Sequence, residues 1–465
     1  MSSLSSEDRL NQIRQSLKAS IGEHIFRDDP AVCARHAGDW SEIPNLQPDM
    51  VVFPATCGQV AQILAACDAV GQPVVIQGGL TGLAGGATPK PQELVISLSK
   101  MNEIERVDSL GGVVRVQAGV TLQALQEHLH PLGWAFPLDL GARGSCQLGG
   151  NAATNAGGNR VIRYGTMRPQ VLGLEVVLPD GTILDMLDQT TKNTTGIDLK
   201  QLFIGAEGTL GVITRLVLKL SPLPKATQTI MCALASFSDA AVFLKELRAA
   251  FPGLSAYELM WDEFMTAACE ACSSSFPFSE RYPLYALVEV QGGDESYDRQ
   301  ALESFLGSAL ENEWIADAIL ANSIADTVKL WAQRESVSEL LSLYKPCLAF
   351  DVGVPMSATG ELVQELENRL SELYPNARHL FFGHLGDGNL HLLSGPYSDA
   401  DRHSAEELVY QLVAQAGGCV SAEHGIGVLK RPYLHFSRDG VQIEIMRRIK
   451  ECLDPGNILN QGRVF

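Results

Sequence analysis

The 465-residue sequence has no uncharged apolar run of the roughly 18 residues that a membrane span requires. Residues 1–9 also lack the charged and then apolar build of a signal peptide. The ten cysteines are scattered, mostly within apolar segments, which is typical of reduced cytosolic thiols and not of a disulfide framework. We therefore expect a cytoplasmic protein without a transmembrane segment.

Positive charge is scarce as well. A net charge of −19 argues against nucleic acids and anionic membrane surfaces as partners. The sequence also lacks the Gly-x-Gly-x-x-Gly fingerprint of dinucleotide-binding Rossmann domains and the Walker A sequence of P-loop proteins. A small anionic substrate remains compatible with the charge, because such a molecule responds to the local field of a pocket.

The length predicts two or three domains, because a single core rarely serves so long a chain. Residues 1–45 form a helical lead-in by their pattern, and strands and helices alternate through a first domain at 46–224. The stretch Pro222–Pro224 marks a boundary, after which the alternation resumes in a second domain at 225–430. A last segment, 431–465, contains one more helix. This alternation indicates a layered α+β or α/β fold.

Two Asp-Gly pairs between apolar runs predict β-hairpins, at Asp180-Gly181 and at Asp387-Gly388. If the second pair is a two-residue turn, His384 lies directly opposite His391. Opposed residues have Cβ atoms roughly 4.5–5.5 Å apart, which lets two imidazoles hold one metal ion. The alternative is a glycine turn that carries two surface or hydrogen-bonded histidines, and this segment by itself favours neither.

Three glycine-rich segments lie in the first domain, at 77–86, 144–159 and 205–214. Consecutive glycines expose backbone N–H groups, which bind phosphate oxygens, and the neighbouring Ser, Thr and Asn side chains add hydrogen-bonding groups. Together the segments suggest one long polar ligand that contains a pyrophosphate. A set of tight turns in a β-rich domain is the alternative.

These segments, in this order, resemble the FAD-binding domain of the vanillyl-alcohol oxidase, or PCMH-type, flavoprotein superfamily. The matching stretches are Pro73–Gly82, Pro137–Gly141, Gly149–Gly158 and Phe203–Gly211. The resemblance implies an α+β protein: a PCMH-type FAD-binding domain of two subdomains, an α/β cap domain for the substrate, and a C-terminal helical segment that returns to the flavin.

FAD is expected to be bound without a covalent bond, because Gly79-Leu80 stand where some members of the superfamily carry a flavin-linked histidine. The residues that the resemblance implies in FAD binding are Gln77, Gly78, Gly79, Leu80, Thr81, Gly82, Pro137, Gly144, Ser145, Gly150, Asn151, Thr154, Asn155, Gly157, Gly158, Gly208, Gly211, Val212, Ile213 and Asn460.

The paired motifs Gly383–His391 and Ala422–Gly427 are similar to those of the FAD-linked D-2-hydroxy acid dehydrogenases. This group includes D-2-hydroxyglutarate dehydrogenase, D-lactate dehydrogenase and the glycolate oxidase large subunit. The resemblance implies that His384, His391 and Glu423 hold a divalent metal. Zinc is expected, because two histidines and one carboxylate form a recurring catalytic zinc set, while manganese and iron accept similar ligands.

The same resemblance assigns roles toward a small 2-hydroxy acid substrate. His424 is the expected general base and contacts the substrate hydroxyl, since an imidazole titrates near the working pH. Arg334 matches the arginine that binds the substrate carboxylate, and Ser338 stands where the hydroxyglutarate enzymes carry a threonine. Without the resemblance, Arg334 would be read as half of a helix-surface ion pair with Glu335 or Glu339.

Two positions depart from the hydroxyglutarate pattern. Ala349 replaces a lysine, and Leu393 replaces an asparagine, and both of the missing groups help to hold the distal end of the substrate. A substrate with a less polar tail is therefore compatible with this chain, although Lys345 is a candidate to compensate.

The implied reaction is oxidation of a D-2-hydroxy acid, such as D-2-hydroxyglutarate, D-lactate or D-malate, to the 2-oxo acid by hydride transfer to FAD. An electron-transfer flavoprotein, a quinone or a cytochrome would accept the electrons, and a homodimer is compatible with the sequence. The main alternative is a flavoprotein subunit of a glycolate- or lactate-oxidising electron-transfer complex. A flavin-free metal hydrolase and a non-redox ether-lipid synthase of the same superfamily are further alternatives.

Overall fold

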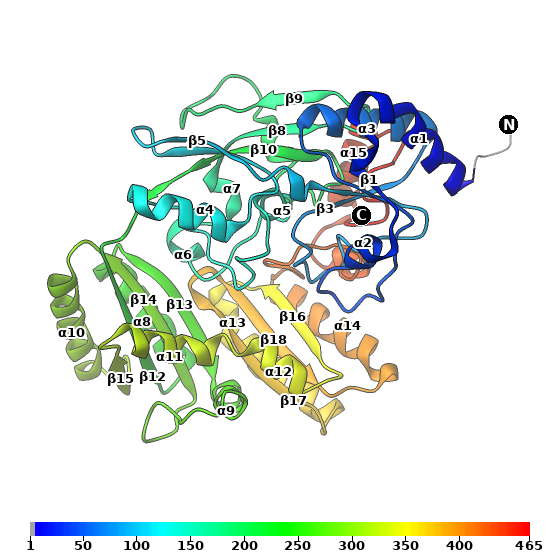
Figure 1. Ribbon diagram of the computed structural model, residues 1–465. Helices are drawn as coiled ribbons and strands as arrows, with labels where there is room; N and C mark the ends of the chain where they lie inside the picture. The colour runs from blue at the N-terminus through cyan, green and yellow to red at the C-terminus, as the bar shows by residue number, and fades with distance from the viewer. Residues whose placement is uncertain (1–4) are drawn as a thin grey trace. The chain divides into compact units, whose positions relative to one another are not determined.

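The computed structural model describes residues 5–465, which divide into two units (Figure 1). The first unit consists of the described residues up to Ala156, together with Thr166–Leu223 and Glu423–Phe465. The second consists of Gly157–Gly165 and Pro224–Ala422. None of the described helices is both long enough and apolar enough to cross a membrane.

The first unit contains a mixed sheet in the order β1-β2-β4-β3, in which β2, β4 and β3 are parallel. A second sheet, β5-β6-β10-β8-β9, is antiparallel throughout, and β11 pairs with β7. The strands are β1 (Phe26–Arg27), β2 (Val51–Val52), β3 (Val74–Gln77), β4 (Leu94–Ser97), β5 (Ile104–Asp108), β6 (Val113–Gln117), β7 (Trp134–Ala135), β8 (Val171–Val177), β9 (Ile183–Met186), β10 (Val212–Lys219) and β11 (Ser221–Pro222). Since β8 pairs with β9, the hairpin predicted at Asp180-Gly181 is confirmed.

Most helices of the first unit begin at a residue whose side chain caps the first turn. In α3 (Cys57–Val70) the Thr56 side chain accepts from the Gln59 N–H, and the helix ends at Gly71 in a left-handed conformation. Its buried side chains recur with helical spacing, so one stripe faces the core. The other helices are α1 (Ser6–Ile21), α2 (Pro30–Arg35), α4 (Leu122–Leu129), α5 (Leu148–Ala153), α7 (Met167–Gln170) and α15 (Gly440–Leu453).

The second unit is built on one seven-stranded antiparallel sheet in the order β15-β12-β14-β13-β17-β18-β16 (Figure 1). Its strands are β12 (Ala226–Leu234), β13 (Leu254–Trp261), β14 (Leu284–Gly292), β15 (Asp317–Leu320), β16 (Leu348–Gly353), β17 (Arg378–His384) and β18 (Asn389–Gly395). Its helices are α6 (Val161–Tyr164), α8 (Phe237–Ala250), α9 (Asp262–Ala271), α10 (Glu295–Glu311), α11 (Ile324–Arg334), α12 (Val337–Leu343), α13 (Met356–Leu373) and α14 (Asp399–Gln415).

Helices cover both faces of this sheet, so its strands are apolar on both sides. On one face, Phe243 of α8 and Leu302 of α10 belong to a buried apolar cluster with strand residues. On the other face, Leu330 of α11 and Leu340 of α12 pack in a separate cluster with Phe382 of β17. This second cluster matters for function, because the strand period of two residues places His384 on the same face as Phe382.

Candidate active site

The hairpin predicted around Asp387-Gly388 is present, but its loop is longer than two residues. β17 pairs with β18 so that His384 faces Asn389, and four residues join the strands. Leu385–Asp387 forms a 3₁₀ turn, and Gly388 follows with a φ of 81°. The predicted direct opposition of His384 and His391 is therefore wrong, because the loop takes up two more residues than the smallest turn.

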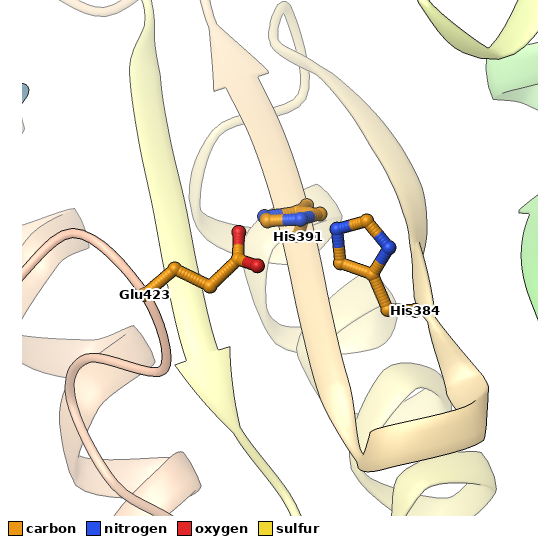
Figure 2. Close-up of side chains that lie close together, drawn as sticks. All are labelled: His384, His391 and Glu423. Carbon is orange, nitrogen blue, oxygen red and sulfur yellow. The ribbon is translucent and has the colours of Figure 1, made fainter. Parts of the chain in front are cut away.

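The two histidines nevertheless share one face, since the register differs from the predicted one by two residues. Their ring centroids lie 5.2 Å apart, with the ring planes at 79°. Figure 2 shows the Glu423 carboxylate directed toward both rings. One ligand atom of each residue lies within 4.8 Å of the others, and both histidines are buried. Two imidazoles and one carboxylate at this spacing fit a divalent metal such as zinc.

Glu423 belongs to a loop whose shape requires glycine. Gly425 and Gly427 have φ values of +76° and +51°, and a Cβ on Gly427 would lie 2.2 Å from the Ala84 carbonyl oxygen. The Glu207 carboxylate accepts from the Ile426 and Gly427 N–H groups at 2.7 and 2.8 Å. Burial raises the pKa of Glu207, although these two hydrogen bonds lower it.

His424 lies in a second cluster, with Asp351 and Glu423, whose ligand atoms are also within 4.8 Å of one another. Asp351 is fully buried on β16 and faces His391 in register. The Ser421 hydroxyl donates to Asp351 Oδ2 at 3.4 Å. Carboxylates beside an imidazole orient the ring for proton transfer, so the placement of His424 suits the predicted general base.

A buried ion network supports His384. Glu258 of β13 is in register with His384, and its Oε1 lies 2.7 Å from His384 Nδ1. Its Oε2 accepts from Arg334 Nε at 2.9 Å, and the Arg334 guanidinium lies 4.8 Å from the ring centre of Phe382. Burial alone would raise the pKa of Glu258, but its interactions with His384 and with the Arg334 guanidinium hold it below the ordinary value of a glutamate.

The surface ion pair that was the alternative for Arg334 is wrong. Arg334 is only 6 % exposed, and its partner is Glu258 instead of Glu335 or Glu339. Ser338, by contrast, is exposed on α12, and its hydroxyl donates to Glu339 Oε2 at 2.9 Å. The structure therefore brings Arg334 to the histidines and leaves Ser338 turned to its own helix; their substrate roles stay predictions.

Asn389, which the sequence did not single out, occupies the position opposite His384. It is 6 % exposed, and neither its Nδ2 nor its Oδ1 has a hydrogen-bond partner among the described residues. Leaving a buried amide without partners costs about 1–3 kcal/mol, so this side chain suits a bound polar ligand. In the sequence, the position of Asn389 directly before the apolar run of β18 is the feature that could have indicated this residue.

The two departures from the hydroxyglutarate pattern meet in the structure. Ala349 of β16 faces Leu393 of β18 in register, and Leu393 faces Leu380 on its other side. Leu393 is 4 % exposed within the apolar cluster that also contains Leu340. The lysine and the asparagine that the pattern would supply are thus absent from one continuous cross-strand row.

The predicted flavin-binding segments of the first unit gather at the carboxyl end of β3. A Cβ on Gly79 would lie 2.0 Å from the Ser145 carbonyl oxygen, so these two loops meet backbone to backbone. A Cβ on Gly150 would meet no atom of the described residues within 4 Å outside its own helix turn, so there is open space beside this glycine. Gln147 Oε1, close to Gly78, is buried and has no hydrogen-bond partner in the part of the chain that the structure describes. These features fit a polar cofactor.

Several residues that are predicted to bind FAD form hydrogen bonds with other parts of the protein. Gln77 donates to the His36 and Ala87 carbonyl oxygens. Asn155 Oδ1 accepts from Thr166 Oγ1 and Arg168 N. Their side chains therefore shape the segment, and a contact with FAD remains a prediction.

Asn460 is a third example. It links β3 to the third glycine segment, since its Oδ1 accepts from Ile76 N and its Nδ2 donates to the Glu207 carbonyl. The glycines Gly157 and Gly158 are the two residues of the predicted set that belong to the second unit. Glu207 lies among these glycines but was not among the residues predicted from the sequence. A charged residue inside a segment of small residues was the feature that could have indicated its role.

Two family models match successive parts of the chain. The model described as an FAD binding domain matches residues 48–187, and the model described as the C-terminal domain of FAD linked oxidases matches residues 223–464.

Among similar proteins, D-2-hydroxyglutarate dehydrogenase of Bos taurus is 40% identical over 431 residues, covering 92% of this chain and 78% of its own. D-2-hydroxyglutarate dehydrogenase of Xanthomonas citri is 36% identical over 460 residues, covering 97% and 96%. A Schizosaccharomyces pombe protein, provisionally named a D-lactate dehydrogenase, is 38% identical over 447 residues, covering 93% and 84%.

Solved structures share the fold. A substrate-bound p-cresol methylhydroxylase superposes with a TM-score of 0.78 at 14% identity, covering 98% of this chain and 96% of that chain. An alkyldihydroxyacetonephosphate synthase gives 0.75 at 19% identity, covering 97% and 84%. These likenesses confirm the fold class expected from the sequence.

We predict that Gly427→Ala destabilises the first unit, because an alanine there combines a left-handed backbone with a contact against Ala84. The expected loss is about 2 kcal/mol, read as a lower midpoint of denaturant unfolding. Gly440→Ala is the matched control, since a Cβ there meets no atom within 4 Å and the residue opens a helix. Equal midpoints for the two variants would contradict the account of the loop.

Proposed function

Because this chain belongs to the FAD-linked oxidase family, we propose that it is an FAD- and divalent-metal-dependent dehydrogenase that oxidises a D-2-hydroxy acid to the 2-oxo acid. The observation that carries the metal part is the group of His384, His391 and Glu423, whose ligand atoms lie within 4.8 Å of one another. The full-length relatives named as D-2-hydroxyglutarate dehydrogenases support the substrate class.

When bound, FAD supplies the acceptor of the hydride from the second carbon of the substrate, and the metal supplies a Lewis acid. His424 takes the hydroxyl proton on a ring nitrogen, and Asp351 and Glu423 orient its imidazole. Arg334 offers its terminal nitrogens to the substrate carboxylate, while its Nε stays on Glu258. The burial of this arginine makes the attraction stronger than at an exposed surface.

The tail of the substrate is proposed to be less polar than that of 2-hydroxyglutarate. Leu393 and Ala349 supply no hydrogen-bonding side chain in the row where the hydroxyglutarate enzymes carry an asparagine and a lysine. A second carboxylate in that row would lose water without gaining a partner, which disfavours it. D-lactate and similar short acids therefore fit this proposal better than D-2-hydroxyglutarate.

Anaerobic addition of D-2-hydroxy acids to the holoprotein is expected to bleach the flavin absorbance, whereas the L-isomers should not. Prior chelation should slow bleaching by about 100-fold, because the charge stabilisation supplied by a metal is lost, and added Zn²⁺ or Mn²⁺ should restore it. Stopped-flow absorbance with paired D- and L-acids provides the measurement. Bleaching that ignores chelation, or that prefers L-acids, would refute the proposed reaction.

His391→Ala is expected to retain FAD but to lose the metal and the bleaching reaction, since only two ligands remain. Metal content after dialysis and the flavin spectrum report the two properties separately. His379→Ala is the control, because His379 lies on the same hairpin, bonds Ser394 and is not in the cluster. Burial lowers the pKa of His379 to about 4, so its removal takes away no charge at neutral pH. Loss of metal from both variants would mean that the hairpin as a whole, and not the ligand set, was disturbed.

Leu393→Asn is expected to raise kcat/KM for D-2-hydroxyglutarate relative to D-lactate by about 10-fold, the equivalent of one hydrogen bond to a charged group. Leu393→Ala removes the same apolar contact without adding an amide, so its ratio of the two kcat/KM values should stay near that of the wild type. An equal change of the ratio in both variants would argue against a polar requirement in this row.

A further inference from the structure

One buried carboxylate near the ligand cluster has no role in the reaction described above. Glu258 lies in the middle of the seven-stranded sheet, is 0 % exposed, and contacts two charged or polar groups from different elements. His384 comes from β17 and Arg334 from α11, so a single carboxylate joins the expected metal ligand to the expected substrate arginine.

We propose that Glu258 is a positioning residue that fixes the tautomer of His384 and the orientation of Arg334. The inference rests on the proposed function, since it assigns the two partners the roles given there. A carboxylate can only accept hydrogen bonds when ionised, so its contact with His384 Nδ1 places the ring proton on that nitrogen. The lone pair of Nε2 is then left for a metal.

The direction of the ring agrees with this assignment. Figure 2 shows one ring nitrogen of His384 facing His391 and Glu423, while the other nitrogen points away from them. The nitrogen that contacts Glu258 is Nδ1, so the two nitrogens of one imidazole serve opposite sides. Support of this kind typically changes metal affinity by 10–100-fold when it is removed.

The second oxygen of Glu258 acts on Arg334. It binds the inner nitrogen, Nε, and the flat guanidinium lies over the Phe382 ring. Among the described residues, this is the one hydrogen bond of the Arg334 side chain, so the two outer nitrogens remain for a carboxylate ligand. A guanidinium held at Nε and on one face has little freedom left, which favours a two-point contact with a substrate carboxylate.

The test compares Glu258→Gln with Glu289→Gln. Glu289 is a matched control: it is 4 % exposed on the neighbouring strand β14 and pairs with Arg160 at 2.9 Å, and none of its hydrogen bonds among the described residues is with a histidine. Zn²⁺ affinity is measured on the FAD-loaded protein by competition with a chromogenic chelator, and the Co²⁺ form is examined by absorbance.

Glu258→Gln is expected to weaken Zn²⁺ binding by 10–100-fold, to alter the Co²⁺ spectrum and to raise KM more than it lowers kcat. Glu289→Gln should keep the metal affinity of the wild type within about 2-fold, even where its stability falls. Wild-type affinity and an unchanged Co²⁺ spectrum in Glu258→Gln would overturn the inference and leave Glu258 a structural residue. A wild-type protein that binds no metal would instead overturn the proposed function, so the two failures are distinguishable.

A measurement on the wild-type protein covers the case in which Glu258→Gln does not fold. Nitrogen-15 NMR of labelled histidine rings reports which ring nitrogen carries the proton, with His384 assigned by comparison with His384→Gln. The inference requires a proton on Nδ1 of His384 in the zinc-loaded protein. A proton on Nε2, with Nδ1 bound to the metal, would refute it.

Discussion

The hydrogen-bond register of β17 and β18 determines which side chains meet in the second unit. Because β13 pairs with β17 in the same sheet, Glu258, His384 and Asn389 form one cross-strand row. Two residues along the strands, on the same face, His391 lies beside Asp351. Each histidine thus has a carboxylate on an adjacent strand, and a slip of one residue would turn both imidazoles to the opposite face. The two histidines and the carboxylates beside them are therefore placed by the pairing of neighbouring strands in one sheet.

This row of polar residues lies beside an apolar cluster, and these apolar surroundings affect the strength of its electrostatic interactions. Leu330 and Leu340 pack in the apolar cluster on the same sheet face, and the three residues of the row are themselves buried. Electrostatic attraction strengthens where water is excluded, but a charge without a partner is costly there. Glu258 is buried and is not left without a partner, because its carboxylate contacts His384 on the sheet and Arg334 on α11. A binding group in this place is pre-oriented before any ligand arrives.

The sequence predicts the components of this site better than their arrangement. Both Asp-Gly pairs lie in hairpin loops, as predicted, but the length of a loop also depends on contacts with the backbone of other segments. At the second hairpin, a Cβ on Gly388 would lie 2.7 Å from the Val354 carbonyl oxygen, a contact from a distant strand end that no local pattern contains. The predicted register of His384 and His391 therefore differs from the observed one by two residues. Because side chains alternate between the faces of a strand with a period of two, both histidines still lie on the same face.

Long-range partners explain the other differences. Arg334 lies on the buried stripe of α11, yet its partner is 76 residues away in a strand of apolar pattern, so nearby glutamates were the natural candidates. Glu207 is similar, because its two N–H partners lie more than 200 residues along the chain, at Ile426 and Gly427. Charged residues inside apolar or glycine-rich segments are the detectable sign, although their partners are set by tertiary structure.

The three expected metal ligands are held by different means, and this difference bears on how a site of this kind forms. His384 and His391 are fixed by the backbone ladder of one hairpin, so their spacing is established once the strands pair. Glu423 comes from a loop without a ladder, whose course depends on left-handed glycines and on the Glu207 carboxylate. Ordering such a loop costs conformational entropy that the hairpin has already lost. The hairpin therefore holds two of the three expected ligands in place, and the hydrogen bonds from the Glu423 loop to Glu207 reduce the conformational entropy that is still to be lost when the third is brought in.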